Sequence, residues 1–278
     1  MKKIFSILLT TALLCSMLLP MTVSAEEVIS ATGTTVIEVT SAYRDFYDTD
    51  GTKWQGTQDK ADSNASGGYF IRVNRAAFTD HGLRTAENSI PVSVASAGEY
   101  IVTFVASKES VPSLKVYNGQ DSVSYDSYAQ TDLKFRYNDT GANFYAMEYY
   151  YTVNLTEDTT SIAVVLPSHK KNSTTWDFCL AMDCIRFTKK TESNVISNGS
   201  SEVTVVYDAA QRAAGQAILA LYNGKQLVAV EKLDNSLGKL IMQFSTTYAG
   251  EFDKAIVYIW EDLVNCVPKV ARKALTVN

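Results

Sequence analysis

The chain has 278 residues, 25 Lys and Arg against 30 Asp and Glu, and a formal net charge of −5 at pH 7. This acidic balance excludes the positive electrostatic footprint that a nucleic-acid partner requires. The two histidines, His81 and His169, lie in polar sequence without metal-ligand spacing, and neither a GxSxG elbow nor a glycine-rich phosphate loop occurs. The sequence therefore presents no recognisable catalytic motif.

Residues 1–25 have the pattern of a signal peptide. Lys2 and Lys3 precede the apolar run Ile4–Leu19, and Thr22–Ala25 ends in the small-x-small pattern that signal peptidase cleaves. The apolar run is too short for a comfortable bilayer span, which needs about 20 residues. We therefore predict a secreted, extracellular bacterial protein without a membrane span, whose mature chain has 23 basic and 30 acidic groups.

Three cysteines follow the signal peptide, namely Cys179, Cys184 and Cys266. An odd number in an extracellular protein argues against a disulfide framework. Cys179 and Cys184 lie five residues apart on one predicted strand, so their side chains point to opposite faces. We expect both to act as small buried hydrophobic residues.

Short apolar runs separated by Gly, Asn, Asp and Ser recur along the whole mature chain and predict an all-β protein. We expect a jelly-roll β-sandwich over residues 26–188, a polar linker over 189–201 and a smaller immunoglobulin- or fibronectin III-like β-sandwich over 202–278. The expected strands of the first sandwich are 34–40, 68–73, 90–94, 99–106, 114–117, 149–154, 161–166 and 178–187. Those of the second are 202–207, 216–222, 226–231, 239–244, 255–260 and 273–277.

Two features predict local detail. In the run EYIVTFVA, Tyr100, Val102 and Phe104 alternate with Ile101 and Val105. A strand that is apolar on both faces belongs in the middle of a covered sheet. The pair Asn223-Gly224 between two apolar runs indicates a two-residue hairpin with a type I′ turn.

Aromatic residues in polar loops suggest how the protein could bind a ligand. Trp54 lies in DGTKWQGT and Trp176 in NSTTWD, directly before the last strand of the first domain. Flat aromatic rings cover the C–H faces of sugars, while nearby amides and carboxylates bind the hydroxyls. The alternative is that each tryptophan folds back as a lid on the core.

Five segments of the first domain resemble carbohydrate-binding modules of families 6 and 35, which have a galactose-binding-like β-sandwich. The matching segments, in order along the chain, are VIEVTSAY (36–43), GGYFIRV (67–73), SAGEYIVTFVAS (96–107), YTVNLTEDTTSIAVVL (151–166) and AMDCIRF (181–187).

The resemblance implies a sugar site and a structural calcium ion. The sugar site would lie in loops at one end of the sandwich, with Trp176 before the last strand, Tyr69 or Trp54 as a second aromatic, and Asn172 or Asp177 as hydrogen-bonding residues. Calcium would be bound by Glu38 and Asp183. Thr40 replaces the second glutamate of the family pattern, and no other cofactor is implied.

The second domain resembles the small immunoglobulin-like accessory domain of secreted clostridial polysaccharide-active proteins, through AILALYNGKQLVAVEK (217–232) and AIVYIWEDLVNCVP (255–268). Together the two resemblances imply a non-catalytic protein that binds a polysaccharide or another glycan, with a cell wall or a partner enzyme as a further partner. Two other hypotheses are a structural or adhesive surface module, and a small polysaccharide lyase or hydrolase.

Overall fold

The structure is a computed structural model that describes most of the mature chain. The described residues are 27–38, 47–48, 57–73, 86–108, 113–126, 128–139, 142–166, 180–191, 193–209, 211–264 and 266–278. The predicted signal peptide therefore lies outside them. In the described part, no helix is long and apolar enough to cross a membrane.

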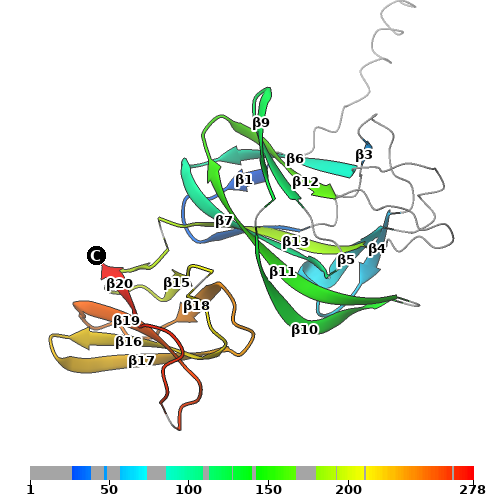
Figure 1. The fold of residues 1–278 in the computed structure, drawn as a ribbon. Coiled ribbons are helices and arrows are strands. Elements are labelled where there is room, and N and C mark those ends of the chain that lie inside the picture. Colours follow the sequence, from blue (N-terminus) through cyan, green and yellow to red (C-terminus); the bar gives the residue numbers. More distant parts are fainter. Residues whose placement is uncertain are drawn as a thin grey trace, which may run out of the picture.

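Two sheets formed by residues 27–189 face each other, and we call them the N-terminal sandwich (Figure 1). The first contains β1 (Glu27–Ile29), β6 (Ala86–Val94), β12 (Thr159–Leu166), β8 (Ser113–Asn118) and β9 (Asp121–Tyr125), and β3 (Tyr47–Asp48) pairs with β6. The second contains β10 (Ala129–Asp139), β11 (Ala142–Leu155), β7 (Gly98–Ser107), β13 (Leu180–Lys189), β5 (Tyr69–Val73) and β4 (Thr57–Ala61), and β2 (Thr34–Glu38) pairs with β13.

The central strand β7 is buried on both faces, as the sequence predicts. Tyr100, Val102 and Phe104 belong to the core between the two sheets. Val105 and Ile101, on the opposite face, belong to two smaller clusters. The outer face of this sheet is therefore covered as well, which explains why the strand carries no polar alternation.

Residues 195–277 form a second pair of sheets, the C-terminal sandwich, so the all-β prediction is confirmed for both halves. Five strands pair in the order β14 (Val195–Ile196), β20 (Lys273–Val277), β19 (Lys254–Trp260), β16 (Gly215–Asn223) and β17 (Gln226–Asn235), while β15 (Glu202–Val206) pairs with β18 (Ile241–Ser245). Alternate residues of both sheets share one core.

Two details of this half differ from the sequence prediction. The short strand β14 lies inside the segment expected to be a linker and pairs in parallel with β20. The predicted β16–β17 hairpin is present, but Asn223 pairs with Gln226, so the two connecting residues are Gly224 and Lys225. Gly224 has a φ of 59°, and Asn223 stays in the strand. A register shift between Leu221 and Tyr222 leaves one extra residue on β17 just beyond this turn.

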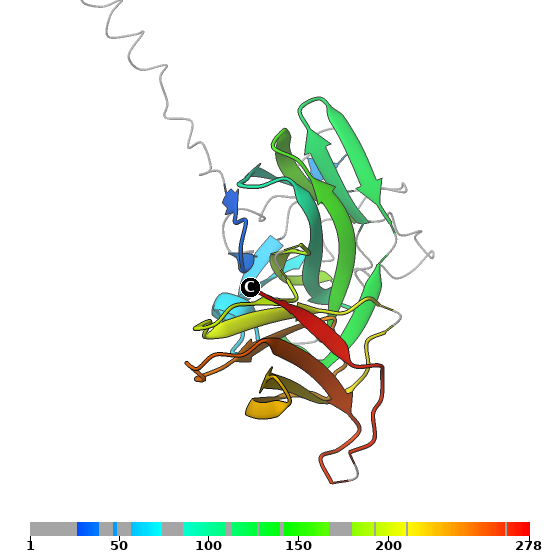
Figure 2. The same ribbon diagram turned by 90° about the vertical axis from the view of Figure 1, so that its left-hand side faces the viewer.

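The C-terminal sandwich packs against the outer face of the larger N-terminal sheet, beside β10 and β11 (Figures 1 and 2). Ile101 and Tyr150 of the N-terminal sandwich share an apolar cluster with Val206 and Leu240. Arg212 donates to Thr131 Oγ1 at 2.6 Å. The outer face of β7 and β11 is therefore part of a contact between the two sandwiches.

Candidate functional site

The strands β4 and β13, which follow the two predicted loop tryptophans in the sequence, begin at the same end of a sheet, on either side of β5. Trp54 and Trp176 lie outside the described residues, as do Asn172 and Asp177. Trp54 precedes the first residue of β4, Thr57, and Trp176 precedes the first residue of β13, Leu180. Thr57 and Leu180 both pair with Val73, from opposite sides of β5. The segments that precede these two strands are thus connected to positions that flank Val73 at the same sheet end.

Tyr69, the third predicted aromatic, is 47% exposed but lies at the opposite end of β5. Tyr69 pairs with Ala61. It lies four residues before Val73 on β5, a separation of roughly 13 Å along a strand. The structure therefore does not bring Tyr69 beside the strand ends that lead to Trp54 and Trp176. Its role in ligand binding stays a prediction.

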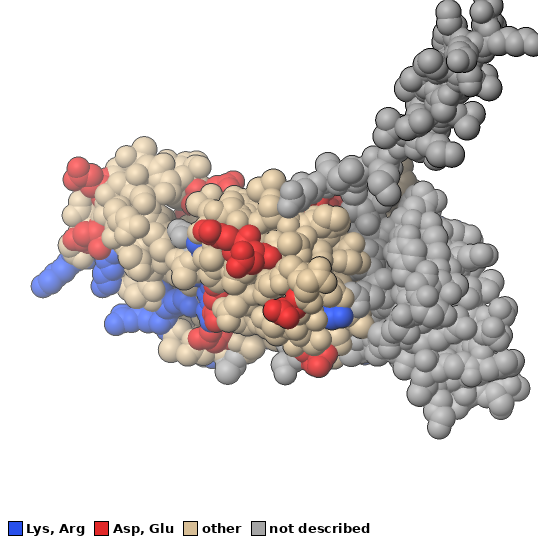
Figure 3. All heavy atoms as spheres, turned by 90° about the horizontal axis from the view of Figure 1, so that it is seen from above, with Lys and Arg blue, Asp and Glu red and all other residues tan. Residues whose placement is uncertain are grey.

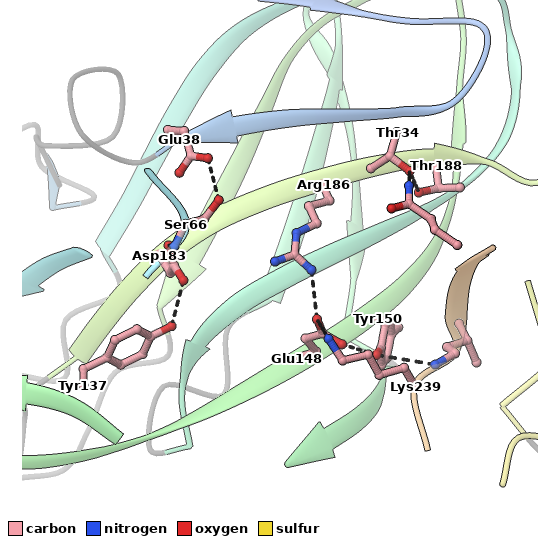
Figure 4. A network of polar contacts seen from close by, with 12 residues as sticks. Thr34, Glu38, Ser66, Tyr137, Glu148, Tyr150, Asp183, Arg186, Thr188 and Lys239 are labelled. Atoms are coloured by element: carbon pink, nitrogen blue, oxygen red, sulfur yellow. Dashed lines mark hydrogen bonds and ion pairs between the residues drawn. The ribbon is translucent and has the colours of Figure 1, made fainter. Parts of the chain in front are cut away.

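Glu38 and Asp183, the predicted calcium ligands, lie on either side of Ser66 (Figure 4). Asp183 is the extra residue where the register of β13 against β7 shifts, a bulge that redirects its side chain. Its Oδ1 accepts the Ser66 N–H at 2.8 Å, and its Oδ2 accepts the Tyr137 hydroxyl at 3.1 Å. Ser66 Oγ in turn donates to Glu38 Oε1 at 2.6 Å.

Burial dominates the electrostatics of this cluster. Desolvation raises the pKa of Asp183 from its usual 3.8 to about 7, although the hydrogen bonds from Ser66 and Tyr137 and the charge of Arg186 oppose the rise. Desolvation also raises the pKa of Tyr137, and the neighbouring Asp183 adds to that effect. The Asp183 carboxylate is therefore costly to keep ionised without a further positive charge.

The cluster fits part of a calcium site. Calcium takes six to eight oxygen ligands. Glu38 and Asp183 supply carboxylate oxygens, and Glu38 Oε2 is buried without a hydrogen-bond partner among the described residues. Over the same residues there is no group of three or more His, Cys, Asp or Glu side chains that could bind a metal. Thr40 lies outside them, so the described part provides two side-chain ligands and not a complete set.

A second polar network, which the sequence did not predict, surrounds Glu148 on β11 (Figure 4). The Glu148 side chain is only 3% exposed, and its Oε1 accepts from Arg186 at 2.9 Å and from Lys239 at 3.3 Å. The Tyr150 hydroxyl donates to Oε2, and the Leu240 N–H donates to that hydroxyl at 3.5 Å. Lys239 and Leu240 come from the C-terminal sandwich, so this buried carboxylate connects both halves.

Two cavities border this network. One of 440 Å³ lies at the seam between the sandwiches, beside Glu148, Arg186 and Thr103. The other, of 330 Å³, is lined by Asp183 and by Glu148, Arg186 and Lys239. Two carboxylates therefore border one cavity, the arrangement a glycoside hydrolase would need, but all their oxygens already accept hydrogen bonds from the protein.

The sequence did contain a signal for the Glu148 network. Glu148 interrupts the run AMEYYY and Arg186 interrupts the run CIRF, and each run is otherwise apolar. A lone charge in such a strand is rarely buried without a partner of opposite charge. Their pairing could not be read from spacing, because β11 and β13 are separated by β7 in the sheet.

The described cysteines of the mature chain differ in their surroundings. Cys184 is buried and reduced, in agreement with the expectation of a small buried hydrophobic residue, and desolvation raises the pKa of its thiol to about 12. Cys266 is exposed and reduced. Cys179 lies outside the described residues.

No family model matches the chain, and no curated protein matches it. Among solved structures, it is similar to a carbohydrate-binding module, CBM6cm-2 of Cellvibrio mixtus lichenase 5A in complex with cellotriose, with 13% identity over 56% of this chain and 97% of that one and a TM-score of 0.29. It is similar to a Paenibacillus xanthan lyase, with 14% identity over 84% of this chain but 26% of that one and a TM-score of 0.30.

A third similar structure is the adhesin domain of Epf from Streptococcus pyogenes, with 12% identity over 88% of this chain and 92% of that domain and a TM-score of 0.25. The resemblance of residues 202–278 to a clostridial accessory domain stays a prediction.

Proposed function

We propose that the protein is a secreted, non-catalytic carbohydrate-binding protein whose first sandwich binds a polysaccharide or glycan through aromatics in its end loops. The observation that carries the proposal is the pairing of Thr57 and Leu180 with the same residue, Val73. Trp54 is three residues from Thr57, and Trp176 is four residues from Leu180. Chains of that length reach at most about 10–14 Å, so both indole rings can meet one ligand.

The polar networks of the described residues support a binding role rather than a catalytic one. Asp183 accepts two hydrogen bonds from its own chain, and Glu148 is neutralised by Arg186 and Lys239. A general acid or base must be free to exchange a proton with the substrate. Carboxylates held in this way stabilise a scaffold.

A structural or adhesive role is the second candidate, because the C-terminal sandwich carries an apolar outer face. Leu227 and Val230 on β17 are 49% and 42% exposed. Exposed apolar patches on a folded domain mark surfaces that bind other molecules. Glycan binding and adhesion are compatible, because the first would use the end loops of the N-terminal sandwich and the second the outer face of the C-terminal sandwich.

The test is affinity electrophoresis of the mature protein through gels that contain single neutral polysaccharides, chosen from a glycan array. We expect Trp176→Ala and Trp54→Ala each to weaken retardation about tenfold or more, because a stacked aromatic is a dominant contact. The melting temperature should change little if the rings lie in loops.

The matched control is Tyr117→Ala, which removes a half-buried aromatic of the same sandwich from the other sheet. It should leave retardation unchanged. Unaltered binding by both tryptophan variants would place the ligand elsewhere, and the absence of any bound glycan on the array would refute the proposed function.

A further inference from the structure

The outer face of the five-stranded C-terminal sheet is apolar where a solvated sheet would be polar. On β16, alternate residues from Ala217 to Leu221 enter the core. The opposite face of the two central strands carries three aliphatic and three aromatic side chains: Ile218, Ala220, Tyr222, Ile256, Tyr258 and Trp260. An antiparallel sheet with one solvated face normally alternates apolar-in and polar-out. This face breaks that rule along both strands.

The three aromatic side chains on this face contact one another in a row. The rings of Tyr258 and Trp260 lie 5.8 Å apart, centroid to centroid. The hydroxyls of Tyr222 and Tyr258 lie 3.4 Å apart. All three side chains are partly exposed, in contrast to the aliphatic residues between them, of which Ile256 is 2% exposed. The rings thus provide an accessible surface above a buried aliphatic layer.

A groove continues this row. A cavity of 500 Å³ is bordered by Tyr258 and Trp260 on one side and by the segment from Pro268 to Arg272 on the other. Trp260 pairs with Pro268 through an isolated bridge, which fixes the groove beside the strand. Among the described residues, nothing fills this space.

Cations lie at both sides of the aromatic row. The Lys254 ammonium group is 5.2 Å from the centre of the Tyr222 ring. Arg272, exposed at the groove, makes no ion pair among the described residues, whereas Lys269 is neutralised by Glu261 at 3.1 Å. Figure 3 shows Lys and Arg at the end of the molecule that lies farthest from the grey residues, with Asp and Glu among them. Lys254 and Arg272 therefore provide two cations beside the aromatic row.

We propose that this face is a second carbohydrate-binding surface, specific for acidic polysaccharides. Aromatic rings in a row accept the C–H faces of successive sugar rings, and the tyrosine hydroxyls bond to sugar hydroxyls. Arg272 and Lys254 bind the carboxylates of uronic acid units, which planar guanidinium recognises in bidentate fashion. The surface is distinct from the end-loop site of the first sandwich and does not depend on it.

The experiment is affinity electrophoresis of the full mature chain in gels containing polygalacturonate, with a neutral galactan as the comparison polymer. We expect retardation by polygalacturonate that decreases with added salt, since exposed charges are screened. Trp260→Ala and Arg272→Gln should each weaken it about tenfold. Lys134→Gln, which removes an exposed cation from the N-terminal sandwich, should not change it.

Arg272→Gln alters only an exposed side chain, so it tests the surface even if Trp260→Ala fails to fold. A double variant, Trp54→Ala with Trp176→Ala, should retain polygalacturonate binding, which separates this surface from the end-loop site. The proposal is wrong if the wild type is not retarded, if Arg272→Gln binds normally, or if the double variant loses polygalacturonate. Sedimentation experiments provide a last check. If the wild type is a dimer and Arg272→Gln dissociates it, the face binds a second copy of the chain and the proposal is wrong.

Discussion

At the residue scale, the most unusual group is Asp183, a carboxylate on a strand bulge that is 2% exposed. Burial removes the water that would solvate the ionised carboxylate, and this desolvation raises the pKa of Asp183 to about 7. Its two hydrogen bonds and the charge of Arg186 offset only part of that cost. The folded protein therefore binds a proton here that the unfolded chain releases near pH 3.8.

This difference predicts a pH dependence of stability. Since the folded-state pKa is the higher one, the contribution is fully present below about pH 3.8 and is lost as pH rises through about 7. The free energy of unfolding should fall by at most about 1.4 kcal/mol per pH unit in that window. Urea denaturation of Asp183→Asn, measured between pH 4 and 8, should show a flatter profile than the wild type. Parallel profiles would contradict the assignment.

A calcium ion bound as the family resemblance implies would oppose this loss of stability at higher pH. A divalent cation beside Glu38 and Asp183 favours their ionised forms. We expect millimolar calcium to raise the melting temperature of the wild type above its value in chelator at pH 7.5. Glu38→Gln should respond less than the wild type. An equal melting temperature with and without calcium in the wild type would exclude the structural ion.

At the element scale, the tight turn Ser66–Gly68 holds the carboxylate cluster together. Ser66 contacts both Glu38 and Asp183, and Gly67 adopts a φ of 65° against the Glu38 carboxylate. A side chain at residue 67 would place its Cβ 3.2 Å from Glu38 Oε2. Only glycine combines this close approach with a left-handed backbone.

Gly67→Ala and Gly68→Ala form a matched pair that separates these two constraints. Both residues have positive φ, so alanine should cost each about 1–2 kcal/mol in free energy of unfolding. A Cβ on Gly68 meets nothing within 4 Å, whereas one on Gly67 presses on Glu38. Gly67→Ala should therefore be the more destabilising by about 1 kcal/mol in thermal or urea unfolding. Equal losses would mean that Glu38 moves aside freely.

The strands that the sequence predicts best are those with buried faces, such as β7, β12 and β16. The strands it misses are polar and lie at sheet edges, for example β4 (TQDKA) and β9 (DSVSY). An edge strand buries little, so apolar periodicity cannot reveal it. The same limit applies to the sites: Glu38 and Asp183 were found through a resemblance, whereas the pairing of Glu148 with Lys239 depends on contact between two sandwiches.

At the scale of the whole molecule, Glu148 anchors the contact between the sandwiches. It is a buried carboxylate of one half that accepts from Lys239 of the other, and Tyr150 beside it packs against Leu240. Removing the charge of Glu148 leaves Arg186 without its carboxylate partner. A buried ion pair that loses one partner is destabilising.

Glu148→Gln should lower the free energy of unfolding by about 2 kcal/mol, less than a fully buried pair because Arg186 and Lys239 keep some solvent. The two sandwiches should then unfold in more separate steps in urea. The control is Asp132→Asn, whose exposed pair with Lys134 contributes less than about 1 kcal/mol. Similar losses in both variants would show that Glu148 does not connect the halves.

The parallel pairing of β14 with β20 has a consequence for the order of folding. The strand that follows the N-terminal sandwich finds its partner only after residues 273–277 are made. Contacts between residues far apart in sequence form slowly, because a long loop must close first. The N-terminal sandwich already closes when β13 joins β7 and β2. It can thus fold first, and the C-terminal sandwich then folds against a finished surface.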